Sequence, residues 1–453
     1  MHEVLIIGGG PGGYRAAELA ARAGLSTVLF EGNALGGVCL NEGCVPSKTL
    51  LNSVKIMEHA RDGAAFGVLA ENVRLDLPAL ITRKRKVVKQ LTGGVRASVK
   101  EAGALIVDSY ARILSAAPGR IRVQADGQEY EGRRLVVATG SGPILPPIPG
   151  LREALESGAA VTSREILERE VLPQRMTVIG AGVIGLELAG YCRAAGVEVD
   201  IVEMTGRIAG NMDLETAAAL KKQFERKGIR FHLDTRVTRI GDGRVEMEGP
   251  EGALTLEAPL VLLAAGRSPT VGGFGLEQSG VLVERGHIPT DDRCRTNVPG
   301  VYAVGDVNGA WMLAHAAYRE AETAVSDMTG GNARMRYDAV PSILYTTPEA
   351  ASVGLTEEQC ALRPGGYAKA VVPMGFSGRF LAETSRETGF CKVLADPAEN
   401  RLLGCHILGP YASEIIVSAG ILIESEARLR DLREFVFPHP TVGEVLREAF
   451  FRL

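Results

Sequence analysis

The sequence predicts an α/β protein with two Rossmann-like dinucleotide-binding domains, and a repeated motif carries this prediction. A strand-like segment at residues 4–7 leads into a glycine-rich run at 8–13, and another at 177–179 leads into a second run at 180–185. Both runs have the spacing Gly-x-Gly-x-x-Gly, which is a weak signal when it occurs alone. In both copies, however, a helix-ending glycine follows sixteen residues after the first motif glycine, and a strand-ending glutamate follows after twenty-three. Two matching βαβ units are therefore expected.

Each unit carries the groups that a bound dinucleotide needs. The glycines let backbone amides approach a pyrophosphate at a helix N-terminus, and a carboxylate at the end of the second strand accepts hydrogen bonds from the adenosine ribose. Glu31 and Glu203 occupy that position. Glu203 would repel the 2′-phosphate of NADP. Arg207 could attract that phosphate, but one arginine beside a glutamate is weaker than the arginine cluster of a phosphate site. The second site should therefore prefer NAD over NADP. The alternative is that both runs are ordinary tight turns of a parallel sheet.

Length and composition limit the classes of protein that fit. A chain of 453 residues is expected to form about three domains. The net charge of −4 and the mixed charge pattern provide no basic surface for a nucleic acid, so no nucleic-acid partner is expected. The longest apolar runs are only strand-sized, and the first strand follows the initial methionine directly, so we expect a cytoplasmic protein with no membrane partner.

The remaining elements are expected in a definite order along the chain. They are helices over 47–90 with a solvated basic face at 83–86, short β segments over 104–137, a proline-rich linker at 143–150, a second β excursion ending at 260–267, a strand at 297–304, and a third domain from about 337 with a helix at 413–425. Gly305 and then Asp306 follow the strand at 297–304. Asp306 could accept hydrogen bonds from a polyol chain, or it could form an Asx turn or an N-cap.

Cys39 and Cys44 form the candidate redox pair. Four residues separate them, and glycines at 36, 37 and 43 provide the backbone freedom that such a tight disulfide ring requires. A helix is expected to begin at Cys44, because Pro46 suits a first turn and residues 50, 54 and 57 form an apolar stripe. The helix N-terminus and Lys48, one turn further on, both favour a thiolate at Cys44.

Three alternatives exist for this cysteine pair: half of a metal site, a structural crosslink, or two unrelated thiols. A zinc site needs two further ligands, and no second close pair exists among the other five cysteines, so no metal is expected. A structural crosslink over so short a loop would remove little entropy from the unfolded chain, and the other thiols suggest a reducing compartment. A catalytic disulfide is therefore favoured.

The chain resembles the flavin-dependent pyridine nucleotide-disulfide oxidoreductases, and within that family the dihydrolipoamide dehydrogenases. The resemblance spans nearly the whole chain and rests on residues 36–48, 139–140, 180–187, 266–267, 305–306, 312–315, 345–349, 439–441 and 444. It implies a homodimer and a C-terminal α+β dimerisation domain at 337–453. The first 148 residues and residues 271–336 would form the FAD-binding domain, and residues 149–270 the NAD-binding domain.

The resemblance also implies FAD and NAD as cofactors and assigns residues to each. FAD would contact Gly8, Gly10, Gly13, Glu31, Lys48, Ala111, Thr139, Gly140, Asp306, Met312, Leu313, Ala314 and His315. NAD would contact Gly180, Gly182, Gly185, Glu187, Glu203, Val237 and Gly266. Lys48 would pair with Glu187 and lie near the flavin.

His439 completes the implied catalytic group and would come from the other subunit. The unperturbed pKa of a histidine suits proton transfer near neutrality, and Glu444 could hold the imidazole. Glu444 also fits a capping box, Thr441-x-x-Glu444, at the start of a terminal helix. The implied reaction is oxidation of a protein-bound dihydrolipoyl group, with Cys39 exchanging thiols with the substrate, Cys44 facing the flavin, and NAD⁺ as the final acceptor. The lipoyl-carrying protein would belong to a 2-oxo acid dehydrogenase or glycine cleavage system.

Two alternatives to this reaction remain open at the level of sequence. One is another NAD(P)H-dependent disulfide or thiol reductase of the same fold. The other is a redox sensor that binds FAD and NAD but turns over little. Phe437 stands where the family commonly has a second histidine, so the expectation about the substrate is weaker than the expectation about the chemistry.

Overall fold

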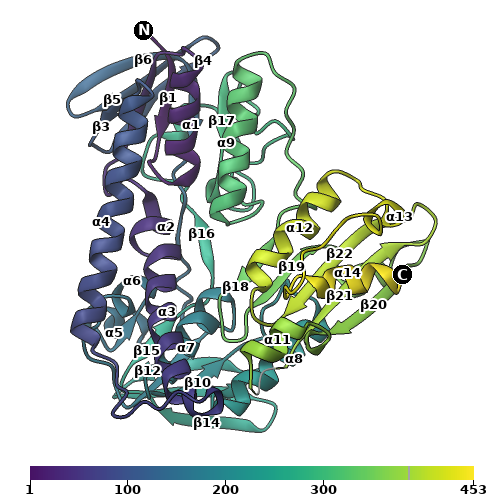
Figure 1. Cartoon of the computed structure of the whole chain (residues 1–453). Coiled ribbons are helices and arrows are strands. Elements are labelled where there is room, and N and C mark those ends of the chain that lie inside the picture. The colour runs from purple at the N-terminus through teal and green to yellow at the C-terminus, as the bar shows by residue number, and fades with distance from the viewer. Residues whose placement is uncertain (386–387) are drawn as a thin grey trace. The chain divides into compact units, whose positions relative to one another are not determined.

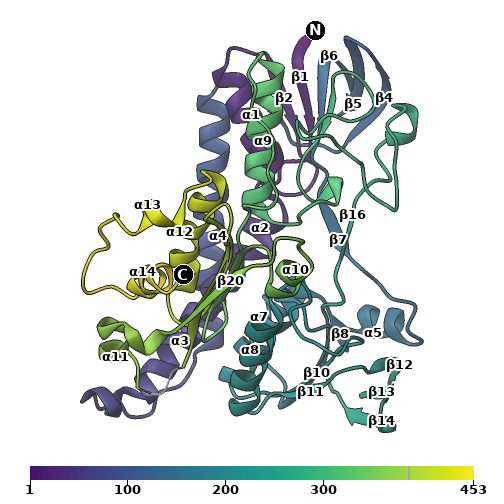
Figure 2. The ribbon, with the colours of Figure 1, turned by 90° about the vertical axis from the view of Figure 1, so that its right-hand side faces the viewer.

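The computed structural model describes residues 1–385 and 388–453, and the chain divides into two compact units (Figures 1 and 2). The first unit contains Met1–Pro46, Thr82–Ile144 and Gly266–Tyr337, and the second contains Ser47–Ile81, Leu145–Ala265 and Asp338–Leu453. Each unit is thus assembled from three separate segments. Among the described residues, no helix has the length and apolar character needed to cross a membrane.

The first unit is built on a seven-stranded sheet in the order β3-β2-β1-β6-β5-β4, with β17 also paired to β6. Its strands are β1 (His2–Ile7), β2 (Thr27–Phe30), β3 (Leu105–Val107), β4 (Ala111–Ala117), β5 (Arg120–Ala125), β6 (Gln128–Val137) and β17 (Val301–Ala303). The pairs β1·β2, β1·β6, β2·β3 and β6·β17 are parallel, whereas β4, β5 and β6 form antiparallel pairs. A separate ribbon joins β7 (Ser141–Pro143) to β16 (Arg267–Pro269).

Alternation along β1 explains how this sheet is covered on both faces. Val4 and Ile6 pack with residues of α1 (Pro11–Arg22) and α9 (Ala314–Met328), two helices that lie side by side in Figures 1 and 2. Leu5 and Ile7 point to the other face and pack with residues of β4 and β5. Because both faces are buried, the last four residues of the strand, Val4–Ile7, are all apolar.

The second unit repeats the nucleotide-binding arrangement with a parallel sheet in the order β11-β10-β9-β15-β8. Its strands are β8 (Ala160–Val161), β9 (Arg175–Ile179), β10 (Glu198–Val202), β11 (Arg230–His232) and β15 (Val261–Leu263), and β12 (Arg236–Gly241), β13 (Arg244–Gly249) and β14 (Gly252–Glu257) form a separate antiparallel sheet. The accompanying helices are α5 (Leu151–Ser157), α6 (Ser163–Ile166), α7 (Val183–Ala194) and α8 (Leu214–Arg226).

The C-terminal part of the second unit is an antiparallel sheet in the order β18-β19-β22-β21-β20, covered by helices. The strands are β18 (Ser342–Leu344), β19 (Ala350–Gly354), β20 (Ala368–Pro373), β21 (Phe390–Asp396) and β22 (Arg401–Leu408). The helices are α10 (Glu357–Ala361), α11 (Gly378–Glu383), α12 (Ala412–Glu424), α13 (Leu429–Leu432) and α14 (Glu444–Phe451). The predicted fold class is confirmed in all three parts, whereas the bounds of the four predicted domain segments stay predictions.

Three helices of the N-terminal region refine the sequence-based expectations. They are α2 (Gly37–Asn41), α3 (Cys44–Arg61) and α4 (Leu77–Glu101). The helix predicted at Cys44 is confirmed, and the stripe at residues 50, 54 and 57 is buried. The prediction that the basic residues 83–86 form a solvated helix face is wrong at Lys84, which is 1% exposed. Residues three and four apart share a helix face, so Lys84 lies on the same face of α4 as the buried Leu80 and Ile81.

An ion pair fixes the edge of the parallel sheet in the second unit. Arg230 donates to both oxygens of the buried Asp200 at 2.8 and 2.7 Å, and His232 Nε2 lies 3.0 Å from one of them. Burial alone would raise the pKa of Asp200, but these two partners outweigh it and hold that pKa well below its ordinary value. The pair joins β10, which ends just before Glu203, to β11.

We predict that Asp200→Asn lowers the free energy of unfolding by about 1–3 kcal/mol at pH 7, because the substitution weakens charge-assisted hydrogen bonds in a buried position. A depressed carboxyl pKa stabilises the fold above the unfolded-state value and loses that effect as the pH falls. The deficit should therefore shrink below about pH 4. Denaturant titrations at pH 7 and pH 3.5 measure it, with Glu251→Gln at an exposed position of the same unit as the control. A deficit that is the same at both pH values would contradict the assignment.

Candidate active site

The first glycine-rich turn is shaped by contacts that exclude side chains. Gly8 has φ +103°, and a Cβ atom there would lie 2.2 Å from the carbonyl oxygen of Ala138. A Cβ on Gly13 would lie 1.8 Å from the carbonyl oxygen of Gly8. Gly10 is the N-cap of α1, and Pro11 opens the helix. The backbone amides at the start of α1 are therefore placed at the carboxyl edge of the sheet, where an anion can approach them.

The second turn reproduces this geometry. Gly180 has φ +105°, and a Cβ atom there would lie 2.3 Å from the carbonyl oxygen of Ala264. A Cβ on Gly185 would lie 2.1 Å from the carbonyl oxygen of Gly180, and Gly182 is the N-cap of α7. The duplication seen in the sequence thus extends to the atoms that shape each cradle.

The two strand-ending glutamates are also held alike. Glu31 accepts the backbone N–H of Gly9 at 2.6 Å and that of Asn33 at 2.7 Å. Glu203 accepts the N–H of Ala181 at 2.8 Å and that of Thr205 at 2.9 Å. Each carboxylate is therefore tied to its glycine-rich turn, in the position that a ribose-binding carboxylate takes.

The redox segment packs directly on the first glycine-rich turn. Gly36 has φ +100°, its N–H donates to the carbonyl of Gly9 at 2.8 Å, and a Cβ on Gly37 would lie 2.6 Å from the Cα of Gly10. Cys39 lies in α2 and Cys44 begins α3, and both are half-buried. The segment is therefore more helical than the predicted loop. Two of the three glycines take positive φ, whereas Gly43 does not.

Other predicted FAD contacts in the first unit lie after the carboxyl ends of the parallel strands. Thr139 and Gly140 follow β6, and Asp306 follows β17. The hydroxyl of Ser141 donates to Asp306, and Nε of Arg267 donates to the same hydroxyl at 2.8 Å. Asp306 forms no helix cap, because Gly305 occupies the N-cap position of the short 3₁₀ helix Asp306–Asn308.

The remaining residues predicted to contact FAD or NAD lie on several different elements. Ala111 begins β4 and is buried in the same cluster as Phe30 of β2. Met312 and Leu313 precede α9, which Ala314 and His315 begin. Val237 is buried in β12, and Gly266 follows β15 with φ +110°. The structure thus shows which element each of these residues belongs to or adjoins, and their cofactor contacts stay predictions.

The predicted pair between Lys48 of α3 and Glu187 of α7 is present in the second unit. The ammonium lies 2.9 and 3.1 Å from the two oxygens of Glu187, whose side chain is 5% exposed. Tyr345 completes the cluster: its N–H donates to Glu187 at 2.9 Å, and its ring centroid lies 4.4 Å from the ammonium. A carboxylate and an aromatic face therefore orient the cation together.

The predicted dyad of His439 and Glu444 is also present. Nδ1 of His439 lies 2.9 Å from Oε1 of Glu444, and Oε2 accepts the N–H of Thr441 at 2.9 Å. The latter bond and the histidine together lower the pKa of Glu444. The capping box considered for Thr441 and Glu444 forms only in part. Glu444 accepts the N–H of Thr441, but Gly443 is the N-cap of α14 and the Thr441 hydroxyl donates to the carbonyl of Pro438. His439 is 77% exposed in the single chain.

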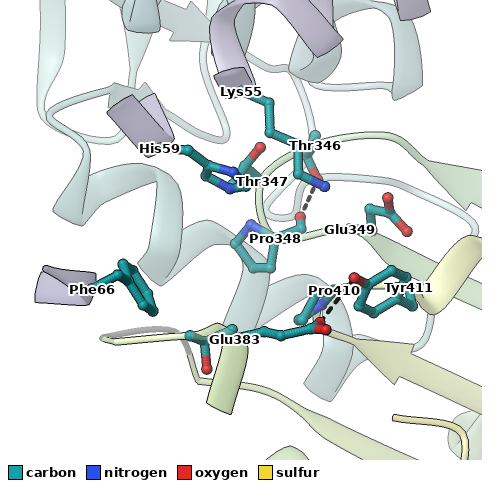
Figure 3. A pocket seen from close by; sticks show the side chains of 11 residues that line it. Lys55, His59, Phe66, Thr346, Thr347, Pro348, Glu349, Glu383, Pro410 and Tyr411 are labelled. Carbon is teal, nitrogen blue, oxygen red and sulfur yellow. Dashed lines mark hydrogen bonds between the residues drawn. The ribbon is translucent and has the colours of Figure 1, made fainter. Parts of the chain in front are cut away.

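A cavity of about 360 Å³ lies elsewhere in the second unit. Figure 3 shows Lys55 and His59 of α3 on one side of Pro348, and Glu383 and Tyr411 on the other. The hydroxyl of Tyr411 donates to Glu383 at 2.9 Å. No predicted cofactor or catalytic residue is among the described residues that line this cavity.

Sequence reasoning assigned no role to several residues of these clusters. Tyr345 lies in the segment 345–349 on which the family resemblance rests, but its contacts with Lys48 and Glu187 depend on the tertiary fold. Tyr14 and Tyr318 of the first unit form a hydroxyl-to-hydroxyl hydrogen bond between α1 and α9. A 304-residue separation in sequence hides such a pair.

The sequence matches two family models. Residues 2–321 match the pyridine nucleotide-disulphide oxidoreductase model, and residues 340–450 match the dimerisation domain of the same family. A mitochondrial dihydrolipoyl dehydrogenase from Canis lupus familiaris is 37% identical over 99% of this chain and 89% of its own length. A mitochondrial dihydrolipoyl dehydrogenase from Arabidopsis thaliana is 38% identical with the same coverage.

Solved structures share the fold over the whole length. LpdA from Mycobacterium tuberculosis has a TM-score of 0.91 at 25% identity, covering 100% of this chain and 99% of that one. The HOCl-induced flavoprotein disulfide reductase RclA from Escherichia coli has a TM-score of 0.85 at 25% identity, covering 99% of each chain.

We predict that Gly185→Ala weakens NAD binding by tenfold or more, about 1.4 kcal/mol, because the new methyl group would push α7 away from the carbonyl of Gly180. Gly190→Ala is the matched control on the same helix, since its Cβ would meet the Phe224 ring at 3.7 Å, an ordinary contact. Isothermal titration with NAD⁺ measures both variants. Equal affinity in the two variants would contradict the close-approach role of Gly185.

We also predict that alkylation of the reduced native protein is confined to Cys39 and Cys44. The other five cysteines are buried, and burial raises the pKa of Cys192 to about 12 and that of Cys360 to about 11. Because the thiolate is the nucleophile, these buried thiols should not react at neutral pH. Mass spectrometry after iodoacetamide treatment tests this, and denatured protein labelled at all seven sites is the control. Rapid labelling of Cys192 would contradict it.

Proposed function

Because the chain belongs to the pyridine nucleotide-disulphide oxidoreductase family, we propose that it oxidises a protein-bound dihydrolipoyl group and reduces NAD⁺. The chain is an NAD-dependent flavoprotein oxidoreductase, and enzymes of this family use FAD and NAD. The observation that best supports the proposal is the redox segment packed on the first glycine-rich turn through Gly36 and Gly37. The dimerisation domain at 340–450 supports the predicted homodimer.

The residues present fit both dinucleotides. In each glycine-rich turn the close backbone contacts at Gly13 and Gly185 bring the start of the following helix to the strand edge. Each turn also has a carboxylate tied beside it by backbone N–H groups. In this proposal FAD takes the turn at Gly8, Gly10 and Gly13, and NAD takes the turn at Gly180, Gly182 and Gly185. Lys48 is held by Glu187 and carries a fixed positive charge.

Thiol exchange at Cys39 is the first proposed step. One substrate thiol loses its proton to His439 of the partner subunit, and the resulting thiolate attacks Cys39. The Cys39–Cys44 bond breaks, a mixed disulfide forms, and Cys44 leaves as a thiolate. The second substrate thiol then attacks the substrate sulfur of the mixed disulfide, which releases oxidised lipoyl disulfide and the thiol of Cys39. FAD, when bound, carries the electron pair from the dithiol to NAD⁺.

The His439–Glu444 geometry supports the role of a base. An ionised Glu444 only accepts hydrogen bonds, so Nδ1 of His439 carries the proton and Nε2 is left to accept another. Oε2 is fixed by Thr441, which prevents the carboxylate from rotating away. The large exposure of His439 in the single chain suits a residue that serves a partner's site.

The finer parts of the proposal concern the substrate carrier and the location. The carrier would be a lipoyl-carrying acyltransferase or carrier protein of a 2-oxo acid dehydrogenase or glycine cleavage system. A cytoplasmic location stays a prediction, and the relatives named above from dog and Arabidopsis are mitochondrial proteins.

We predict that the purified homodimer forms NADH from dihydrolipoamide much faster than it reduces glutathione disulfide with NADPH. The carboxylate of Glu203 repels a 2′-phosphate, so NADP⁺ should replace NAD⁺ poorly. Steady-state absorbance at 340 nm measures both reactions. Faster glutathione disulfide reduction would favour the alternative reductase, and negligible turnover in both assays would favour a redox sensor.

We further predict that Cys39→Ser and Cys44→Ser each lower lipoamide turnover by roughly a thousandfold or more, as loss of a covalent catalytic group does. Cys360→Ala, which removes a buried thiol of α10, should keep near-normal turnover. Full lipoamide turnover in Cys44→Ser would contradict the assigned disulfide.

A further inference from the structure

A buried lysine in the second unit has no part in the reaction proposed above. Lys392 of β21 is 0% exposed and contacts three carboxylates. Its Nζ lies 2.6 Å from Asp213, 3.0 Å from Glu215 and 2.8 Å from Glu357. Burial alone would lower the pKa of Lys392, but the three carboxylates outweigh it and raise that pKa. A buried ion cluster usually adds little net stability compared with apolar packing, so its position calls for another role.

Asp213 is the centre of this cluster and is fully buried. It is the N-cap of α8 and accepts the N–H of Thr216 at 3.1 Å. Its other oxygen accepts the N–H of Glu357 at 3.1 Å. Asp213 is therefore fixed to α8, to the start of α10 and to β21 at once.

Asp213 also ends the loop that Glu203 begins. The loop is tied to the second glycine-rich turn at two points. At its first residue, Glu203 accepts the N–H of Ala181, and further along, the N–H of Ala209 donates to the carbonyl of Ala181 at 2.8 Å. Near its end, Arg207 donates to the carbonyl of Met212 at 3.0 Å, and Met212 directly precedes Asp213. The loop that carries both Glu203 and Arg207 is thus fixed at its two ends.

We propose that Lys392 is a positioning residue for nucleotide choice, because it holds Asp213 and thereby keeps Arg207 bound to Met212 rather than available to a 2′-phosphate. The inference rests on the proposed function, in which this loop faces the adenosine ribose of NAD. With the anchor intact, Glu203 faces the ribose and disfavours NADP. With the anchor released, the end of the loop relaxes and Arg207 can pair with a phosphate.

Two variants release the anchor in different ways. Asp213→Asn keeps an oxygen for the helix cap and removes the charge that faces Lys392. Lys392→Met removes the cation and keeps most of the apolar volume. Glu215→Gln is the matched control, since its half-exposed side chain contacts the same ammonium but lies outside the loop.

The experiment measures the affinities of the FAD-loaded homodimer for NAD⁺ and NADP⁺ by isothermal titration, with circular dichroism as the folding check. In Asp213→Asn and Lys392→Met, the preference for NAD⁺ over NADP⁺ should fall by about five- to tenfold, at the lower end of the range for coupled sites. Glu215→Gln should keep the wild-type preference. Adding Arg207→Ala to Asp213→Asn should remove the gain in NADP⁺ affinity.

The outcomes separate this inference from the proposed function. If the wild-type protein prefers NAD⁺ but folded Asp213→Asn keeps the same preference, only the positioning role of Lys392 falls. An equal loss of preference in Glu215→Gln would also overturn it, because general loss of negative charge would explain the result. If the wild-type protein binds neither nucleotide, the proposed function and this inference fall together. Should Lys392→Met fail to fold, Asp213→Asn decides the question.

Discussion

The close approach of a motif glycine to the carbonyl at the end of the preceding strand is the constraint on which the chemistry depends. Gly13 meets Gly8 in this way, and Gly185 meets Gly180. The contact leaves no space for a side chain, so each helix begins close to the strand edge with its amides directed outward. Gly36 and Gly37 pack onto the first of these turns. The position of the cysteine pair therefore depends on four glycines without side chains, at residues 8, 13, 36 and 37.

The two nucleotide-binding βαβ units have the same glycine-rich turn, but different contacts hold the segment that follows the strand-ending glutamate. In the first unit, the chain after Glu31 is tied back to the glycine-rich turn by Gly36, which leads into the redox segment. In the second unit, the chain after Glu203 ends at Asp213, which a buried lysine of the C-terminal sheet holds. The two βαβ units thus differ in the attachment of the segment that follows the glutamate. One copy supports a reactive cysteine pair, and the other connects the nucleotide loop to the dimerisation domain.

Local pattern was sufficient to predict the repeated turns, their helices and the fold class, because spacing within some thirty residues determines these elements. The Lys48–Glu187 pair spans 139 residues and was expected only from the family resemblance. Tyr345 and Lys392 had no local signal, since their partners come from other helices. The capping box at Thr441 is incomplete because α14 begins at Glu444, two residues later than the pattern indicates. Lys84 was misplaced because charge argued for solvent while helical periodicity placed it inside.

Each compact unit is made of three segments that alternate along the chain, and this has a consequence for synthesis on the ribosome. The first unit is complete only when the chain has been made as far as Tyr337, since β17 and α9 come last. The second unit needs the final helix, α14. Neither unit can therefore complete its fold before part of the other has been synthesised. Apolar strands of both units stay unpaired during part of translation. A nascent chain with this organisation keeps apolar segments unpaired for longer than one whose domains follow each other in sequence.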